Sequence, residues 1–132
     1  MLMARRWLTY LPALGWYAFI FWLSSHPKLP GPEDKLLEFI WFKTAHAIFY
    51  AILTALTLVG TINVFSGDSQ RKRITVLAVF IAVVILATLD ELHQAFVPGR
   101  QAMARDVVID SVAAAAVLLG FSRYNWGRKR RF

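Results

Sequence analysis

The chain has 132 residues, of which 58% are hydrophobic and 17% are charged, a composition too apolar for a soluble domain and typical of a small integral membrane protein. Its net charge of +7 would suit nucleic-acid binding if the basic residues shared one surface, but they form short clusters beside apolar segments, so we expect no nucleic-acid partner. The absence of cysteine excludes disulfides and thiolate metal sites.

Four apolar segments predict an all-α bundle of four transmembrane helices in a single domain, residues 1–132. The predicted helices span about residues 7–23, 44–65, 74–97 and 106–122. The alternative for the first is a cleaved signal peptide with Arg5 and Arg6 as its basic region, but its many aromatic side chains favour a retained helix. We expect residues 36–42 to lie partly in the membrane interface, because one helix from residue 34 to residue 65 would be about 48 Å long, which exceeds the bilayer core.

Lysine and arginine are distributed unevenly between the two sides of this predicted bundle. Ten of the 15 would lie on the side of the chain termini, whereas five would lie on the opposite side, namely Lys28, Lys35, Lys43, Arg100 and Arg105. Basic residues beside membrane segments stay in the cytoplasm. The N- and C-termini are therefore predicted to be cytoplasmic.

One face of the second predicted helix is polar along most of its length. Its members recur at steps of three or four residues: Lys43, His46, Tyr50, Thr54, Thr57 and Thr61. At about 100° per residue they fall within an arc of roughly 80°. This face is expected to turn toward the other helices, where the threonine hydroxyls bond back to their own helix. The two ionisable residues, Lys43 and His46, need a further reason to be there.

The third helix ends in a cluster of four polar residues, Asp90, Glu91, His93 and Gln94. Asp90 is about 25 Å along the helix from Arg73, which places the cluster at the outer interface. Pro98 and Gly99 are predicted to stop the helix.

The fourth helix carries two carboxylates one turn apart, Asp106 and Asp110. Asp110 is about 20 Å from Arg123 at the inner edge, so it needs a polar cavity. Polar ends of three helices thus converge on a pocket open to the extracytoplasmic side. The predicted ligand-binding residues are Lys43, Tyr50, Gln94, Arg100, Asp106 and Asp110, and the candidate catalytic residues are His46, Asp90 and Glu91.

These residues resemble the pattern of the VanZ-like family of bacterial membrane proteins. The resemblance covers Ser24-Ser25-His26-Pro27, Lys43-x-x-His46-x-x-x-Tyr50, and Asp90-Glu91-x-x-Gln94-x-Phe96-x-Pro98-Gly99-Arg100 followed by Asp106. The chain departs from the family pattern in having Phe42, Asp110 and Ala113 where an acidic or amide residue, Asn and Gly are usual. The resemblance implies a four-helix protein of the bacterial cytoplasmic (inner) membrane and cell envelope, and some similar proteins are associated with antibiotic resistance, to teicoplanin-type glycopeptides. It implies no reaction.

The favoured function is binding of an envelope component, such as a lipid-linked precursor, a lipid headgroup, a peptide or a glycopeptide. Arg100 and Lys43 would hold phosphate or carboxylate in this pocket. The alternative is an intramembrane hydrolase or transferase with His46 as general base, held by Asp90 or Glu91.

Two further functions are weaker alternatives. A metal-dependent enzyme would use His46, Glu91, Asp106 and His93 as ligands, but the spacings typical of metal motifs are missing, so no metal or other cofactor is predicted. A transporter would need a polar path through the inner half of the membrane, where this chain has only threonines, and a chain of this length would have to form a homo-oligomer.

Overall fold

The computed structural model describes residues 6–27, 30–65 and 69–129, which form a short 3-10 helix and four α-helices without any strand. The 3-10 helix η1 spans Leu8–Tyr10, and the α-helices are α2 (Leu11–Ser24), α3 (Lys35–Val64), α4 (Ser69–Gln94) and α5 (Ala104–Lys129). The all-α fold class is therefore confirmed.

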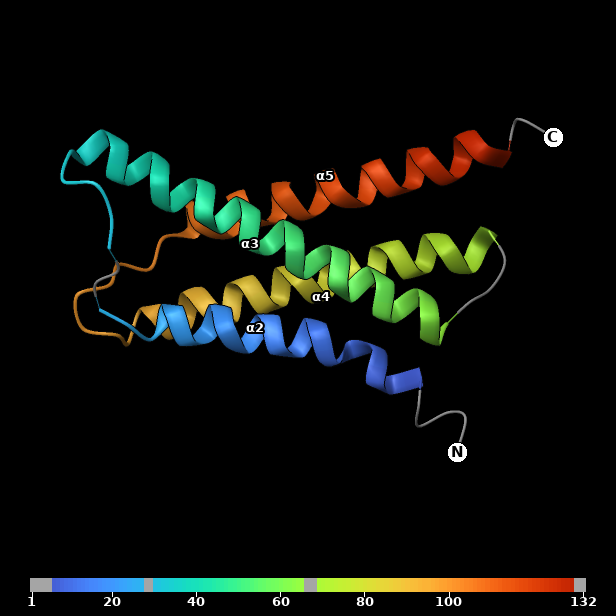
Figure 1. Ribbon diagram of the computed structural model, residues 1–132, viewed down its shortest axis with the longest axis horizontal. Helices are drawn as coiled ribbons and strands as arrows, with labels where there is room; N and C mark the ends of the chain where they lie inside the picture. The colour runs from blue at the N-terminus through green and yellow to red at the C-terminus, as the bar shows by residue number, and fades with distance from the viewer. Residues whose placement is uncertain (1–5, 28–29, 66–68, 130–132) are drawn as a thin grey trace.

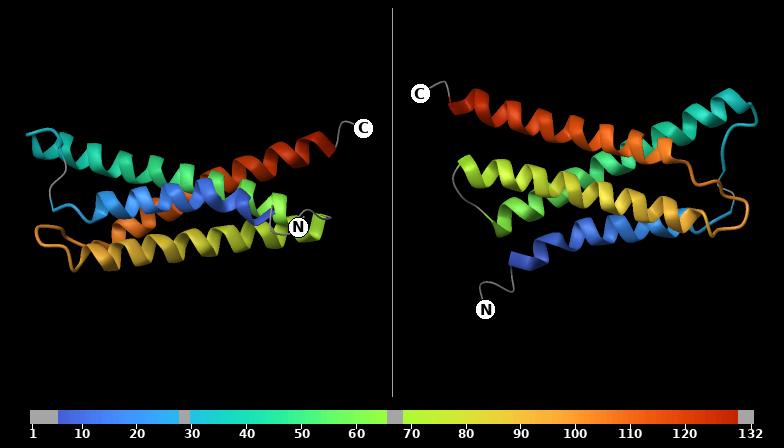
Figure 2. Two further views of the ribbon diagram at one scale, coloured as in Figure 1. Left: turned by 60° about the horizontal axis from the view of Figure 1, so that its bottom comes forward. Right: turned by 180° about the vertical axis from the view of Figure 1, so that it is seen from behind.

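Consecutive helices of the bundle are antiparallel (Figure 1). Helix α3 packs against each of the other three, and α2 packs against α3 and α4. The start of η1 and the end of α5 lie at the same end of the bundle, whereas the α2–α3 and α4–α5 connections lie at the opposite end, as the two further views also show (Figure 2). We call this opposite end the loop end.

Local chemistry accounts for several helix boundaries. The Asp34 carboxylate accepts hydrogen bonds from the amides of Leu36 and Leu37, both at 3.0 Å, and so caps the start of α3. Helix α4 ends at Gln94, before the predicted residue 97, because the residue preceding a proline avoids the helical conformation and Pro98 follows Val97. Gly99 then adopts a φ of 82°, a conformation that glycine reaches without steric cost.

Helix α3 differs most from the predicted boundaries. It begins at Lys35 rather than at residue 44 and runs unbroken for 30 residues, about 45 Å. The expected separate interfacial segment, residues 36–42, is thus the first part of α3. Its large apolar side chains are exposed, including Leu36, Ile40 and Trp41, so the helix extends past its partners at the loop end. Helices α4 and α5 are also longer than predicted at the end near the termini, beginning at Ser69 and ending at Lys129.

The surface of the bundle is rich in large apolar side chains. Exposed examples occur on every helix, among them Leu14, Ile48, Ile81 and Leu119. A soluble monomer rarely exposes so much apolar surface, whereas a lipid environment accommodates it. Helix α3 and the Lys72–Gln94 part of α4 are long and apolar enough to cross a membrane, and residues Leu8–Ser24 form a shorter apolar helix. Four spans remain a prediction.

The first helix is attached to the rest of the bundle by side chains that bond to neighbouring backbones. The Trp16 indole donates to the carbonyl of Phe49 at 2.9 Å, and the Tyr17 hydroxyl donates to the carbonyl of Leu86 at 3.2 Å. Both aromatic rings also pack on a core whose buried members include Tyr50 and Val83. These contacts fix the middle of α2 against α3 and α4.

Candidate functional site

The polar face of α3 points into the bundle, as predicted. Tyr50, Thr54 and Thr61 are buried. The Thr54 hydroxyl donates to the Tyr50 carbonyl at 2.6 Å, and the Thr61 hydroxyl donates to the Thr57 carbonyl at 2.7 Å. The hydroxyls of these two threonines therefore donate to carbonyls of their own helix. The polar groups of α3 that remain available for chemistry lie nearer the loop end.

Two pairs join α3 to α5. The Lys43 ammonium donates to both carboxylate oxygens of Asp106, at 2.5 and 2.6 Å. One turn further along, His46 Nδ1 lies 3.3 Å from Oδ2 of Asp110, whose side chain is 1% exposed. The 3.3 Å contact gives Oδ2 of this buried carboxylate the partner that it requires, whereas its Oδ1 is buried without a hydrogen-bond partner. This contact also differs from the expectation that Asp90 or Glu91 would hold His46.

Asp90 is the centre of a second network, between α2 and α4. Its Oδ2 accepts hydrogen bonds from the Ser24 hydroxyl at 2.9 Å and from the Gln94 amide at 3.1 Å. Ser24 is 5% exposed and was not among the predicted site residues. The only indication of it in the sequence was its position in the Ser-Ser-His-Pro motif.

The other members of the α4 cluster point in different directions. Glu91 Oε2 accepts a hydrogen bond from the Met103 amide at 2.7 Å, which ties α4 to the segment leading into α5. His93 faces α2 instead, where it stacks on Phe21 with 4.2 Å between ring centroids and contacts the Ser25 hydroxyl at 3.0 Å. The members of the cluster therefore contact several different partners.

Arg100 bonds to main-chain carbonyls. Its Nε donates to the carbonyl of His26 at 2.9 Å, and its Nη2 donates to that of Leu23 at 3.1 Å. Within the described part of the chain, no carboxylate forms an ion pair with it. Burial lowers the pKa of Arg100 below its usual value, and the more distant charges of Asp90 and Glu91 oppose that shift. The arginine thus remains a cation without a directly bound anion.

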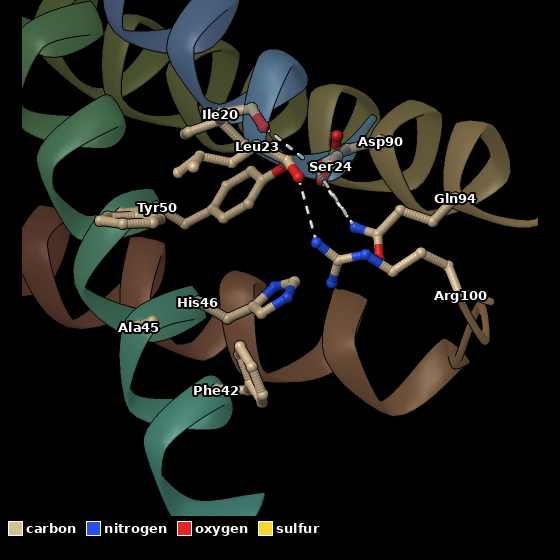
Figure 3. A pocket seen from close by; sticks show the side chains of 11 residues that line it. Ile20, Leu23, Ser24, Phe42, Ala45, His46, Tyr50, Asp90, Gln94 and Arg100 are labelled. Atoms are coloured by element: carbon tan, nitrogen blue, oxygen red, sulfur yellow. Dashed lines mark hydrogen bonds between the residues drawn. The ribbon is translucent and has the colours of Figure 1, made fainter. Parts of the chain in front are cut away.

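These groups surround a pocket between α2, α3, α4 and the α4–α5 connection (Figure 3). Its volume of about 50 Å³ accommodates a few water molecules or one small polar group. Two buried atoms of its lining have no hydrogen-bond partner, the Tyr50 hydroxyl and Oδ1 of Asp90. The lining residues are Ile20, Leu23, Ser24, Phe42, Ala45, His46, Phe49, Tyr50, Asp90, Gln94 and Arg100.

The structure places all nine predicted site residues near the loop end, but in two layers. Five of them line the pocket described above: His46, Tyr50, Asp90, Gln94 and Arg100. The other four, Lys43, Glu91, Asp106 and Asp110, lie behind His46, toward α5. Three residues offer metal-ligand atoms within 4.8 Å of one another, namely His46, Glu91 and Asp106.

Comparisons with known proteins give one match. A search of curated proteins and a search of solved structures each found none. The VanZ/LLP1 family model matches residues 4–125, which include all four α-helices for most of their length. The matched range also contains every residue of the two networks described above. The chain therefore belongs to the VanZ/LLP1 family.

Proposed function

We propose that this protein binds the polar headgroup of a lipid, either a membrane phospholipid or a lipid-linked envelope precursor. The site is the pocket lined by His46, Tyr50, Asp90, Gln94 and Arg100, which we call the headgroup pocket. The observation that carries the proposal is the unused bonding capacity of the lining. The Tyr50 hydroxyl and Asp90 Oδ1 lack partners, and Arg100 has no bound carboxylate. A buried polar group without a partner costs about 1–3 kcal/mol, so a ligand that satisfies several of them is favoured.

The chemistry of the lining specifies the kind of ligand. The Arg100 guanidinium suits a phosphate or a carboxylate. Asp90 Oδ1 is an acceptor, so it suits a hydroxyl or an amine on the same ligand. Apolar side chains of α2 and α3, including Ile20 and Phe49, form the remaining wall and suit the chain attached to the headgroup. A pocket of about 50 Å³ is far smaller than the roughly 300–1,000 Å³ typical of drug-sized ligands, so it would hold one group of a larger molecule.

The proposal includes the position of the protein in the membrane: all four helices span the cytoplasmic membrane of a bacterium, with both chain termini in the cytoplasm. Support comes from the antiparallel order of the helices, the exposed apolar side chains and the excess of basic residues at the end of the termini. The headgroup pocket then opens on the extracytoplasmic side, where envelope precursors are used.

Native mass spectrometry of the full chain in nanodiscs tests the proposal. One set contains phosphatidylglycerol and the other undecaprenyl phosphate in a neutral lipid, so the arms separate a phospholipid from a lipid-linked precursor. We expect one lipid to remain bound through delipidation, and Arg100→Ala to reduce its retention at least tenfold. Arg105→Ala is the control, because Arg105 also lies near the loop end but is 54% exposed and outside the pocket. Equal retention by wild type and Arg100→Ala would contradict the proposal.

Resistance to teicoplanin-type glycopeptides is a consequence to test in cells. If the ligand is a lipid-linked precursor, expression in a susceptible bacterium should raise the inhibitory concentration of teicoplanin. Arg100→Ala should abolish the increase, whereas Arg105→Ala should retain it. Unchanged susceptibility with well-expressed protein would separate lipid binding from resistance.

A second candidate function is an intramembrane hydrolase with His46 as general base. It is favoured by the contact between His46 Nδ1 and Asp110, because a carboxylate at one ring nitrogen orients the other to accept a proton. His46 also lines the pocket. Water would be the nucleophile, and the Arg100 guanidinium would stabilise the developing negative charge. Release of phosphate or a shortened lipid by wild type, reduced about 100-fold or more in His46→Gln, would support this function. Turnover unchanged in that variant would exclude it.

A further inference from the structure

We propose that His46, Glu91 and Asp106 bind a divalent transition-metal ion behind the headgroup pocket. They come from three different helices, α3, α4 and α5, and one potential ligand atom from each lies within 4.8 Å of the others. Metal–ligand bonds of about 2.0–2.2 Å place ligand atoms roughly 3.3 Å apart in a tetrahedral site. A shift of about an ångström in flexible side chains therefore closes the triad on an ion.

Glu91 has an oxygen that the protein leaves unused. Its Oε2 is held by the Met103 amide at 2.7 Å, whereas Oε1 is buried without a hydrogen-bond partner. The whole residue is only 5% exposed. Leaving a buried carboxylate oxygen without a donor or a cation is unfavourable. The fixed Oε2 and the free Oε1 together make Glu91 an oriented ligand.

His46 has the support that metal-binding histidines usually have. Such a histidine donates its second ring N–H to a carboxylate or carbonyl, which fixes the ring and its tautomer. His46 Nδ1 lies 3.3 Å from Asp110, a residue with 1% exposure. This contact leaves Nε2 for the ion. A histidine bound to metal in this way would not serve as the general base of the second candidate function, so the two uses of His46 are distinguishable.

The charge balance of the site also favours a dication. Four carboxylates at the loop end are each at most 5% exposed: Asp90, Glu91, Asp106 and Asp110. The cations that face them are Lys43, Arg100 and the 54% exposed Arg105, which lies 4.0 Å from Asp106, so the two less exposed cations alone leave an excess of two negative charges while His46 is neutral. An uncompensated buried charge is costly. One divalent ion removes that excess.

Lys43 does not exclude the ion. A carboxylate has about four lone-pair positions, so Asp106 can accept both hydrogen bonds from Lys43 and still ligate a metal. The ammonium nevertheless repels a dication, so its removal should tighten binding. One imidazole nitrogen with two carboxylate oxygens suits Zn²⁺ or Mn²⁺, whereas Ca²⁺ and Mg²⁺ prefer oxygen ligands alone.

The first test is calorimetric titration of Zn²⁺ into the full chain in detergent, purified without a polyhistidine tag and stripped with a chelator. We expect one Zn²⁺ per chain in wild type. Glu91→Gln should weaken binding by more than about 100-fold, and Asp110→Asn, which removes the carboxylate beside His46 and one of the four negative charges but no ligand of the triad, by about 10- to 100-fold. Asp90→Asn is the matched control, because it removes the neighbouring carboxylate outside the triad and should keep the stoichiometry. Glu91 is not part of the pocket lining, so loss of Zn²⁺ with lipid retention intact separates this site from the headgroup pocket.

The second test does not depend on the folding of a carboxylate variant. Electron spin echo spectra of Mn²⁺ bound to wild type should show modulation from an imidazole nitrogen, and His46→Gln should lose it. Absence of one-to-one binding, unchanged affinity in Glu91→Gln, or no imidazole modulation in wild type would each overturn the proposal. Metal binding that occurs only in Lys43→Met would also overturn the proposal, because the Lys43 ammonium group would then be the natural counter-ion of these carboxylates.

Discussion

The ammonium group of Lys43 lies 2.6 Å from Oδ2 of Asp106 and thereby joins α3 to α5 near the loop end. The two side chains are 17% and 6% exposed, so the pair is largely removed from solvent. Losing one member of such a pair is far more costly than losing both, because the remaining charge stays buried.

Lys43→Met should therefore destabilise the protein by about 3–5 kcal/mol, because the Asp106 carboxylate loses its counter-ion. The double variant Lys43→Met/Asp106→Asn should recover most of this loss. The measurement is denaturant unfolding in detergent, followed by circular dichroism. Arg105→Met is the control and should change stability by no more than about 1 kcal/mol, since Arg105 is exposed. Equal destabilisation of the single and double variants would show that the pair does not act in this way.

Gly60→Ala should destabilise the contact between η1 and α3. A Cβ at this position would lie 2.9 Å from the Tyr10 ring and 3.3 Å from the Thr9 carbonyl oxygen, so η1 would have to move. We expect a loss of about 1–3 kcal/mol, measured as a lower thermal midpoint in detergent. Gly120→Ala is the matched helical control, because no atom lies within 4 Å of its added Cβ. It should be neutral or stabilising by up to about 1 kcal/mol. A Gly60→Ala midpoint equal to that of Gly120→Ala would be inconsistent with this packing.

Ser24→Ala should weaken the attachment of α2 to α4. The change removes the donor to Asp90 Oδ2 and leaves that buried carboxylate with Gln94 alone, at a cost of about 1–3 kcal/mol. Ser25→Ala is the control, since it removes only exposed contacts, including the one between Ser25 and His93, and should cost less. Proteolysis of α2 in detergent measures the effect, and Ser24→Ala should be cut faster. Equal rates in both variants would argue against a role for the Ser24 hydroxyl in holding α2.

Single-cysteine labelling can determine the topology, because the chain has no cysteine of its own. Gln101→Cys, in the exposed α4–α5 connection, should react with a membrane-impermeant maleimide in intact cells. Lys72→Cys, near the start of α4 at the other end of the bundle, should react only after permeabilisation. The opposite pattern would place the headgroup pocket in the cytoplasm and contradict the proposed function.

The sequence predicted the number and order of the helices because each apolar segment is long and is flanked by charges or turn residues. It misplaced the start of α3, because a single helix over residues 34–65 was judged too long for the bilayer core, whereas α3 runs unbroken for 30 residues. Helical periodicity also showed which residues of α3 face inward. The polar face of a helix can be identified from the sequence of that helix alone, without its neighbours. The burial of Tyr50 and Thr54 agrees with this prediction.

The partners of the site residues could not be predicted in the same way. Periodicity does not show how neighbouring helices are rotated about their axes, so the contact of His46 with Asp110 could not be distinguished from one with Asp90 or Glu91. The sequence did name His46, Glu91 and Asp106 among possible metal ligands, but they lie on three helices without a characteristic spacing along the chain, so only the structure shows that their ligand atoms lie close together. Ser24 is small and lies at the end of an apolar helix, where nothing in its surroundings indicates a buried network.

The two hydrogen bonds from Arg100 to the carbonyls of Leu23 and His26 depend on the path of the main chain rather than on side-chain identity. Substitutions at either position that preserve the end of α2 would leave both bonds in place. These two hydrogen bonds therefore constrain the amino acid at position 100 but not those at positions 23 and 26. When homologous sequences are aligned, position 100 should show no correlated substitution with position 23 or position 26.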